Sequence, residues 1–183
     1  MRKPLRFLSL FLLVGLQPAP ATTMVPLTLA QLEAASERIV IASAVARECR
    51  WQDKKIITVY RLEVAESIKG AATSTLEVTL PGGSVKEPYP LAMTVPGVPH
   101  LALKQRVLLF LQARPAGGDT ITGWTQGCYD IRRDETGRER VDVPSFVLGE
   151  KAKARLDSQG TMALADFLAE IRRTVVEREA RPK

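Results

Sequence analysis

Two segments carry apolar or small residues at successive positions, and this feature constrains the fold more than any other. One is RVLLFLQ (106–112), a continuous apolar run short enough to be a fully buried strand. The other opens the stretch 39–51, where IVIASAVA places small or apolar side chains on both faces of an extended chain. Both segments therefore predict strands, and the first predicts a strand with no solvated face.

Further strands are predicted from the alternation of apolar and polar residues. The stretches 56–68 and 75–80 alternate with period two, and WQDKK (51–55) has the length and polarity of a hairpin connection. Two internal glycines interrupt a long strand pattern at 120–131, which is typical of bulges or tight bends. After the DETG turn, 138–143 is predicted to be an edge strand.

A helix is predicted at each end of the domain. Thr28 and Gln31 have the spacing of a capping box before a short helix over 29–37. The segment 144–160 has no clear periodicity. Thr161 then precedes a stripe of apolar residues at helical spacing, so we expect it to cap a C-terminal amphipathic helix.

Together these elements predict a mainly β protein of five to six strands with a short N-terminal helix and a C-terminal amphipathic helix. A closed or nearly closed β-barrel is the preferred architecture, because closure leaves no long unpaired strand edge. A β-sandwich is the alternative.

The N-terminus has the layout of a secretory signal peptide. A basic start is followed by the apolar run FLSLFLLVGL and by Ala-Pro-Ala, which predicts a signal peptide over 1–21. The apolar run is too short to span a bilayer, and no cysteine follows it to carry a lipid. We therefore expect an exported protein, periplasmic or secreted, with no membrane anchor after cleavage. The barrel with its first helix is expected over 22–143, and a connecting segment with the second helix packed on the barrel over 144–183.

Signal cleavage also weakens the case for nucleic acid as a partner. Loss of Arg2, Lys3 and Arg6 reduces 26 basic residues to 23, against 20 acidic ones. The remaining charges alternate in sign, and no long basic run remains to hold a phosphate backbone. We expect no nucleic-acid binding.

The chain has two cysteines, Cys49 and Cys128. An even count in an oxidising compartment predicts one disulfide between them. The alternative is a pair of buried free thiols.

Known catalytic and metal-binding patterns are missing from the sequence. His100 is the single histidine and is interpreted as a plain surface or loop residue. The sequence contains no G-x-S-x-G elbow, Ser-x-x-Lys pair, phosphate-binding loop or C-x-x-C motif. Its acidic residues fall mostly on the solvated phase of strands. We predict no enzyme activity, metal or cofactor.

The proline- and glycine-rich stretch PGGSVKEPYPLAMTVPGVP (81–99) is the main candidate for function. A loop of this length without secondary structure is uncommon in a compact domain. Its part 84–99 also carries an apolar series that a plain linker does not need. These candidate residues are Tyr89, Leu91, Met93, Val95 and Val98. Either 84–99 folds back as a lid over an open barrel end, or it presents these side chains to a partner.

The order of these motifs resembles a group of uncharacterised exported bacterial proteins and, more distantly, netrin-like modules and tissue inhibitors of metalloproteinases. The resemblance covers about 38–131 and rests mainly on Ile68-Lys69-Gly70, Pro81-Gly82-Gly83 and Val95-Pro96-Gly97. It implies an OB-type five-stranded barrel. Those inhibitors bind zinc through an N-terminal cysteine, whereas the first cysteine here is Cys49, so no inhibitory residue is carried over.

These observations favour a non-catalytic exported binding module. We expect it to contact a protein partner of unknown identity through the barrel surface and the loop 84–99. The alternative is a regulator or inhibitor of an exported hydrolase such as a metalloprotease.

Overall fold

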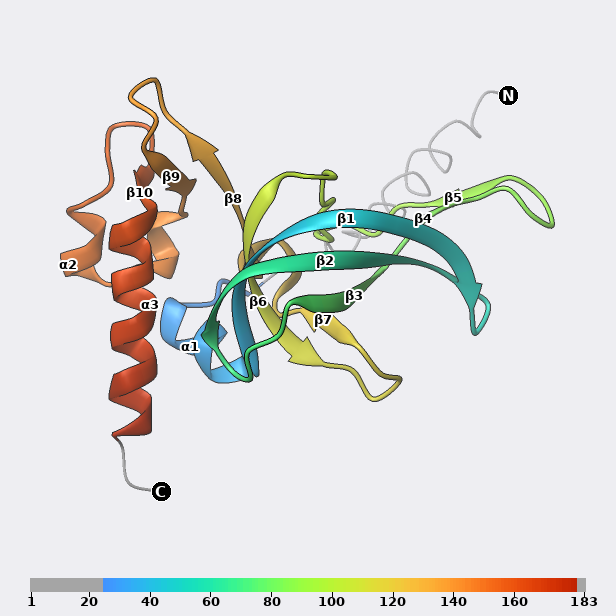
Figure 1. Ribbon diagram of the computed structural model, residues 1–183, viewed down its shortest axis with the longest axis horizontal. Coiled ribbons are helices and arrows are strands. Elements are labelled where there is room, and N and C mark those ends of the chain that lie inside the picture. Colours follow the sequence, from blue (N-terminus) through green and yellow to red (C-terminus); the bar gives the residue numbers. More distant parts are fainter. Residues whose placement is uncertain (1–24, 181–183) are drawn as a thin grey trace, which may run out of the picture.

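The computed structural model describes residues 25–180, so the expected signal peptide lies outside the described residues. This part of the chain is mainly β, with a helix near each end (Figure 1). The strands are β1 (Arg38–Gln52), β2 (Lys55–Lys69), β3 (Thr75–Pro81), β4 (Gly83–Val85), β5 (Leu91–Met93), β6 (Arg106–Ala113), β7 (Asp119–Ile121), β8 (Cys128–Arg133), β9 (Glu139–Asp142) and β10 (Thr161–Ala163). The helices are α1 (Leu29–Ala35), α2 (Glu150–Lys153) and α3 (Leu164–Glu179), with 3-10 turns η1 (Trp124–Gly127) and η2 (Ser145–Val147).

Five strands form a partial ring. The eight-stranded sheet has the order β1-β2-β3-β7-β6-β8-β9-β10, and β6 also pairs back with β1. The ring is therefore β1-β2-β3-β7-β6, but its β3–β7 seam consists of the single parallel pair Val78↔Asp119. The expected mainly β class is confirmed, while the expected barrel is present as a partial ring and not as a clearly closed barrel.

The two strands with continuous apolar character, β1 and β6, separate two hydrophobic cores. Alternate residues of each strand enter an inner core within the ring, including Val40 of β1 and Leu109 of β6. The intervening residues, such as Ile39 and Phe110, enter an outer core on the other face of the same strands. The continuous apolar pattern thus reflects burial on both faces, as predicted for 106–112.

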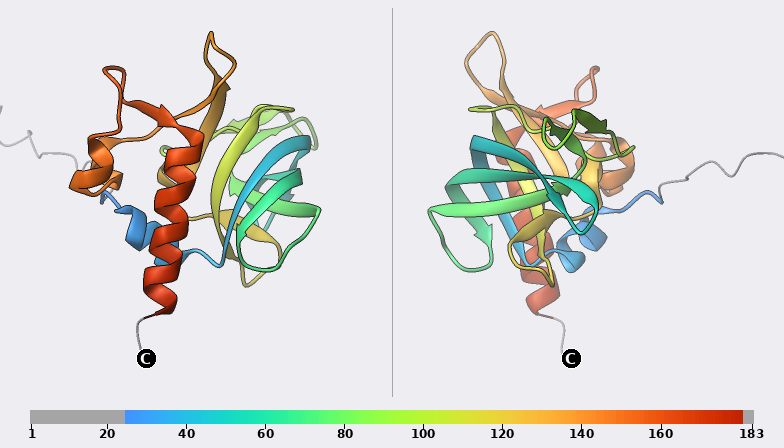
Figure 2. Two further views of the ribbon diagram at one scale, coloured as in Figure 1. Left: turned by 60° about the vertical axis from the view of Figure 1, so that its left-hand side comes forward. Right: turned by 90° about the vertical axis from the view of Figure 1, so that its right-hand side faces the viewer.

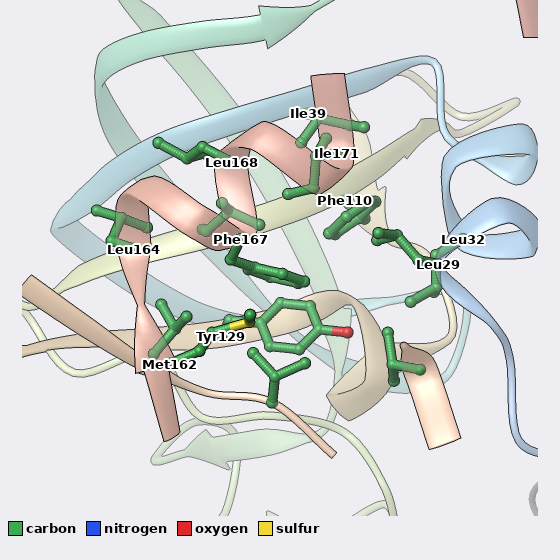
Figure 3. Close-up of a cluster of buried hydrophobic side chains, with 14 of the residues drawn as sticks. Leu29, Leu32, Ile39, Phe110, Tyr129, Met162, Leu164, Phe167, Leu168 and Ile171 are labelled. Atoms are coloured by element: carbon green, nitrogen blue, oxygen red, sulfur yellow. The ribbon is translucent and has the colours of Figure 1, made fainter. Parts of the chain in front are cut away.

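The outer core is covered by helices. Figure 2 shows α3 running along one side of the molecule, with the ring on the other side. Leu32 of α1 and Phe167 of α3 are fully buried there. Tyr129 lies between Phe110 and Phe167, with ring centroids 5.9 and 5.0 Å apart and edge-to-face geometry (Figure 3). Such contacts add to the stability gained from burying the rings.

The N-terminal helix forms as the sequence predicts, but the last helix begins later than expected. The backbone N–H groups of Gln31 and Thr28 donate to the side chains of Thr28 and Gln31 respectively, which completes the capping box. Thr161 is not a helix cap: it belongs to β10 and pairs with Asp142 of β9. Consequently β9 pairs on both sides and is not the edge strand that the sequence suggested.

The stretch 120–131 is two strands, not one. Gly123 has φ +62°, a left-handed conformation that ends β7 and starts the turn η1. A Cβ on Gly127 would lie 2.2 Å from the carbonyl oxygen of Thr122, so only glycine fits where η1 passes into β8. The glycines mark a bend, as predicted, but the bend is sharp enough to separate two strands.

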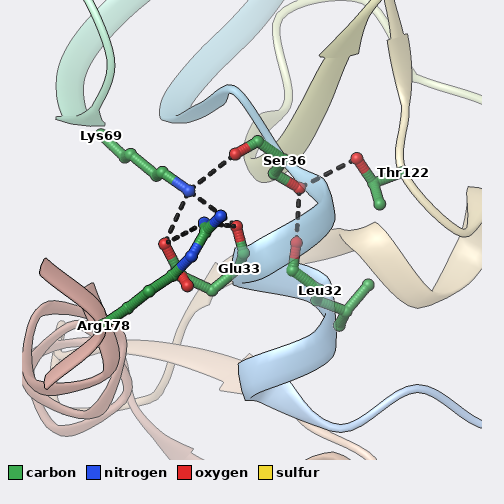
Figure 4. A network of polar contacts seen from close by, with 6 residues as sticks. All are labelled: Leu32, Glu33, Ser36, Lys69, Thr122 and Arg178. Atoms are coloured by element: carbon green, nitrogen blue, oxygen red, sulfur yellow. Dashed lines mark hydrogen bonds and ion pairs between the residues drawn. The ribbon is translucent and has the colours of Figure 1, made fainter. Parts of the chain in front are cut away.

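A buried carboxylate ties three elements together at one end of the molecule (Figure 4). The side chain of Glu33 in α1 is 2% exposed and accepts from Lys69 Nζ of β2 at 2.6 Å and from Arg178 of α3 at 3.3 Å. Lys69 also donates to the backbone carbonyls of Glu33 and Ser36, both at 2.7 Å. The ammonium thus satisfies carbonyls at the C-terminal end of α1, where a cation is favourable.

Replacing Glu33 by glutamine should therefore destabilise the fold. Lys69 would remain largely buried without its counter-charge, and loss of one partner of a buried pair costs about 3 kcal/mol. The measurement is the urea-unfolding midpoint. The matched control is Glu150→Gln, which also removes a lysine contact but from a side chain that is 89% exposed. Its midpoint should stay at the wild-type value, and an equal shift in both variants would contradict this account.

The expected Cys49–Cys128 disulfide is wrong for this structure, because within residues 25–180 both cysteines are free. The strand register explains why. Cys128 at the start of β8 pairs with Leu109 of β6, and Leu109 also pairs with Val40 of β1. Cys49 lies nine positions further along β1, opposite Thr58 of β2. The even cysteine count carried no information about this register.

Alkylation should show two free thiols. Protein that is denatured without reductant should take up iodoacetamide at both cysteines, as read by intact mass. In the native protein at pH 8, Cys128 should stay unmodified, because burial and the nearby Asp130 carboxylate raise its pKa to about 12 and leave little thiolate. Adducts that form only after reduction would show that the cysteines are bonded after all.

Candidate functional site

The candidate segment 84–99 is an ordered hairpin followed by a turn, and not a structureless loop. Strands β4 and β5 pair antiparallel, with Gly83 opposite Met93 and Val85 opposite Leu91. In Figure 1 this hairpin extends away from the ring at the end opposite α3. Three-residue strands are too short to show a period-two pattern. The sequence therefore indicated a proline-rich segment but could not indicate that β4 and β5 pair within it.

The five candidate residues do not share one environment. Near the tip of the hairpin, Tyr89 and Leu91 are exposed, at 57% and 41% of their surface. Met93 and Val95 are half-buried and line a hollow under the hairpin. Val98 packs against the inner core. The segment thus covers the end of the ring with its last residues and projects apolar side chains at its tip.

A tryptophan on β1 supports the tip. The indole N–H of Trp51 donates to the carbonyl oxygen of Glu87 at 3.2 Å. Its ring also meets Tyr89 edge to face, with centroids 6.3 Å apart and an interplanar angle of 65°. Trp51 lies where β1 approaches its turn into β2, so this side chain links the ring of strands to the hairpin tip.

The stem of the hairpin lies close against β1 and β2. Thr58 donates its hydroxyl proton to the carbonyl oxygen of Gly82 at 2.7 Å. A Cβ on Gly83, whose φ is +132°, would lie 2.5 Å from Thr58 Oγ1 and 2.8 Å from Cys49 Sγ. Gly83 is therefore required by the approach of its backbone to these side chains, and Gly82, with φ +97°, is required because its Cβ would lie 2.8 Å from the carbonyl oxygen of Met93.

A shift in strand register gives the end of the ring a polar lining. Up to Ala44, even-numbered residues of β1 face the inner core. The register then shifts between Ala44 and Ala46, so that Arg47 lies opposite Tyr60. One extra residue in a strand reverses which face each later side chain occupies.

His100 lies between Arg47 and Tyr60 and contacts both side chains. A guanidinium nitrogen of Arg47 lies 3.0 Å from His100 Nε2, and the hydroxyl of Tyr60 lies 3.3 Å from His100 Nδ1. The rings of Tyr60 and His100 meet edge to face at 6.4 Å. Burial raises the pKa of Tyr60, although donation from the Leu101 amide and the charge of Arg47 oppose this shift. The phenol is therefore protonated at neutral pH.

Two hollows flank His100. The first, of about 220 Å³, lies between the end of the ring and the hairpin stem, with Tyr60 and Val98 in its lining. The second, of about 300 Å³, lies on the other side and is lined by Asp130, Arg132 and Asp142. His100 is exposed in a loop, in keeping with its interpretation as a surface or loop residue. The sequence did not indicate its contacts with Arg47 and Tyr60, because these depend on the register shift in β1.

Within residues 25–180, no group of three His, Cys, Asp or Glu side chains is arranged to hold a metal ion. No helix in this part of the chain is long and apolar enough to cross a membrane.

Comparison of the chain with known proteins finds no matching family model, curated protein or solved structure.

Proposed function

We propose that this chain is an exported, non-catalytic binding module whose β4–β5 hairpin contacts a protein partner. The observation that carries the proposal is the apolar tip, where Tyr89 and Leu91 are exposed on a hairpin that Trp51 supports. A tyrosine that is already held in place loses little conformational freedom on binding, and tyrosine is enriched among residues that dominate interface energies.

The scaffold of this module is proposed to be an OB-type barrel. The ring β1-β2-β3-β7-β6 has the strand number of that fold, which is a partly open five-stranded barrel. A partly open ring leaves room at its end for a binding element, and here the β4–β5 hairpin occupies that end.

Capture on immobilised protein tests the proposal. Extract of the periplasm and medium of the exporting cell is passed over three columns. One carries the wild-type chain as the cell processes it, one the Tyr89→Ser/Leu91→Ser variant, and one a control variant. The control is Phe146→Ser/Val176→Ser, which removes two other exposed apolar side chains, 47% and 63% exposed, away from the hairpin. Circular dichroism checks that all three are folded.

A protein should bind to the wild-type and control columns and be lost from the hairpin variant. Truncation of a central interface residue costs about 2 kcal/mol, or roughly 30-fold in affinity. If the retained protein is a hydrolase, its activity with and without the added chain separates a regulator from a simple binding module. Equal retention on all three columns, or retention on none, would contradict the proposed contact.

A further inference from the structure

The hydrogen bonds around His100 determine where its proton lies. Arginine can only donate, so His100 Nε2 must accept from Arg47 at their separation of 3.0 Å. In a neutral imidazole the proton is then on Nδ1, which faces the hydroxyl of Tyr60 at 3.3 Å. If Tyr60 donated to Nδ1 instead, the proton of the neutral imidazole would be on Nε2. The Nε2–H and an N–H of Arg47 would then face each other as two donors. His100 therefore donates to Tyr60.

This arrangement leaves the hydroxyl proton of Tyr60 without an acceptor among the described residues. The oxygen of Tyr60 accepts the hydrogen bond from His100 Nδ1–H. Tyr60 is only 2% exposed and lines the hollow of about 220 Å³. A buried hydroxyl that already accepts a hydrogen bond and lines a hollow can donate its own proton to a group that occupies that hollow.

The surroundings of this hollow favour an anion over a cation. Its lining residues, all of them described, include no aspartate, glutamate, lysine or arginine, and Arg47 lies behind His100. Within residues 25–180 the guanidinium of Arg47 is in no ion pair. Arg47, His100 and Tyr60 form a chain of hydrogen bonds, and the charge of the guanidinium polarises each bond along it. The Tyr60 hydroxyl at the end of this chain donates more strongly to a charged acceptor than to a neutral one.

One part of the hollow suits a short hydrocarbon body. Leu80, Val95 and Val98 contribute to its walls. A cavity of roughly 150 Å³ accommodates benzene, so a hollow of about 220 Å³ has room for a ligand of slightly larger size.

We propose that this hollow binds a small organic carboxylate with a short apolar body. The carboxylate accepts the hydroxyl proton of Tyr60, Arg47 supplies positive charge through His100, and the hydrocarbon lies against Leu80, Val95 and Val98. This ligand site goes beyond the proposed protein contact and does not depend on it, because the exposed tip residues Tyr89 and Leu91 are not part of the hollow.

The test is an amide chemical-shift titration by NMR on the chain as the cell processes it, with hexanoate as the probe. Hexanoate should give saturable shifts at Gly83 and Leu101, and hexan-1-ol, which has the same body without the charge, should bind about tenfold more weakly. Tyr60→Phe should weaken hexanoate binding by about tenfold. Tyr129→Phe is the matched control, because it removes a phenol hydroxyl that is also buried but lies in the outer core. It should leave hexanoate binding unchanged.

A second variant keeps the test valid if Tyr60→Phe does not fold. Arg47 is exposed, so Arg47→Gln should fold normally and weaken hexanoate binding about fivefold, while Arg47→Lys should restore most of it. Three results would overturn the proposal: no saturable shift with hexanoate, equal binding of hexanoate and hexan-1-ol, or equal losses in Tyr60→Phe and Tyr129→Phe. None of these results bears on capture by the hairpin tip.

Discussion

Residues 38–43 of β1 pair with 106–111 of β6. Within this pair, the side chains of 39–42 and 107–111 are buried on both faces. Burying one such aliphatic or aromatic side chain contributes about 2 kcal/mol, so the pair gains from two cores at once. The inner core needs β1 and β6 to complete the ring, and the outer core needs the same strands as a floor for α1 and α3. Neither core can therefore be exposed without disrupting the other.

The same strand that joins the two cores also creates the candidate site. Before the register shift between Ala44 and Ala46, β1 contributes Ala42 and Ala44 to the inner core. Beyond this shift it contributes Arg47, which contacts His100, and His100 contacts Tyr60. Because the inside of the ring is apolar and its end is polar, we expect a ligand or partner to bind at that end. The hairpin and the hollow beneath it lie there, supported by the far end of β1.

The sequence predicted the long elements well and the short ones poorly. β1, β2, β3 and β6 were found within about one residue at each end, because their apolar patterns extend over several residues and reflect burial directly. β4, β5 and β10 each have three residues, which is too few for a period, and Thr161 has the chemistry of a helix cap but lies in a strand. The separation of Cys49 from Cys128 and the partners of His100 depend on register and on a bulge, and neither is visible in composition or spacing.

Native-state hydrogen exchange tests most directly whether the β1–β6 pair joins both cores into one unit. Amides of 39–42 and 107–110 should exchange last, at the rate set by global unfolding. As denaturant is added, the free energies of exchange of protected amides in α3 and in β2 should converge on this same global value. The β4–β5 hairpin should exchange earlier. Exchange of α3 and β8–β10 with a free energy well below that of the ring, while β1–β6 stays protected, would show two separable units and contradict this account.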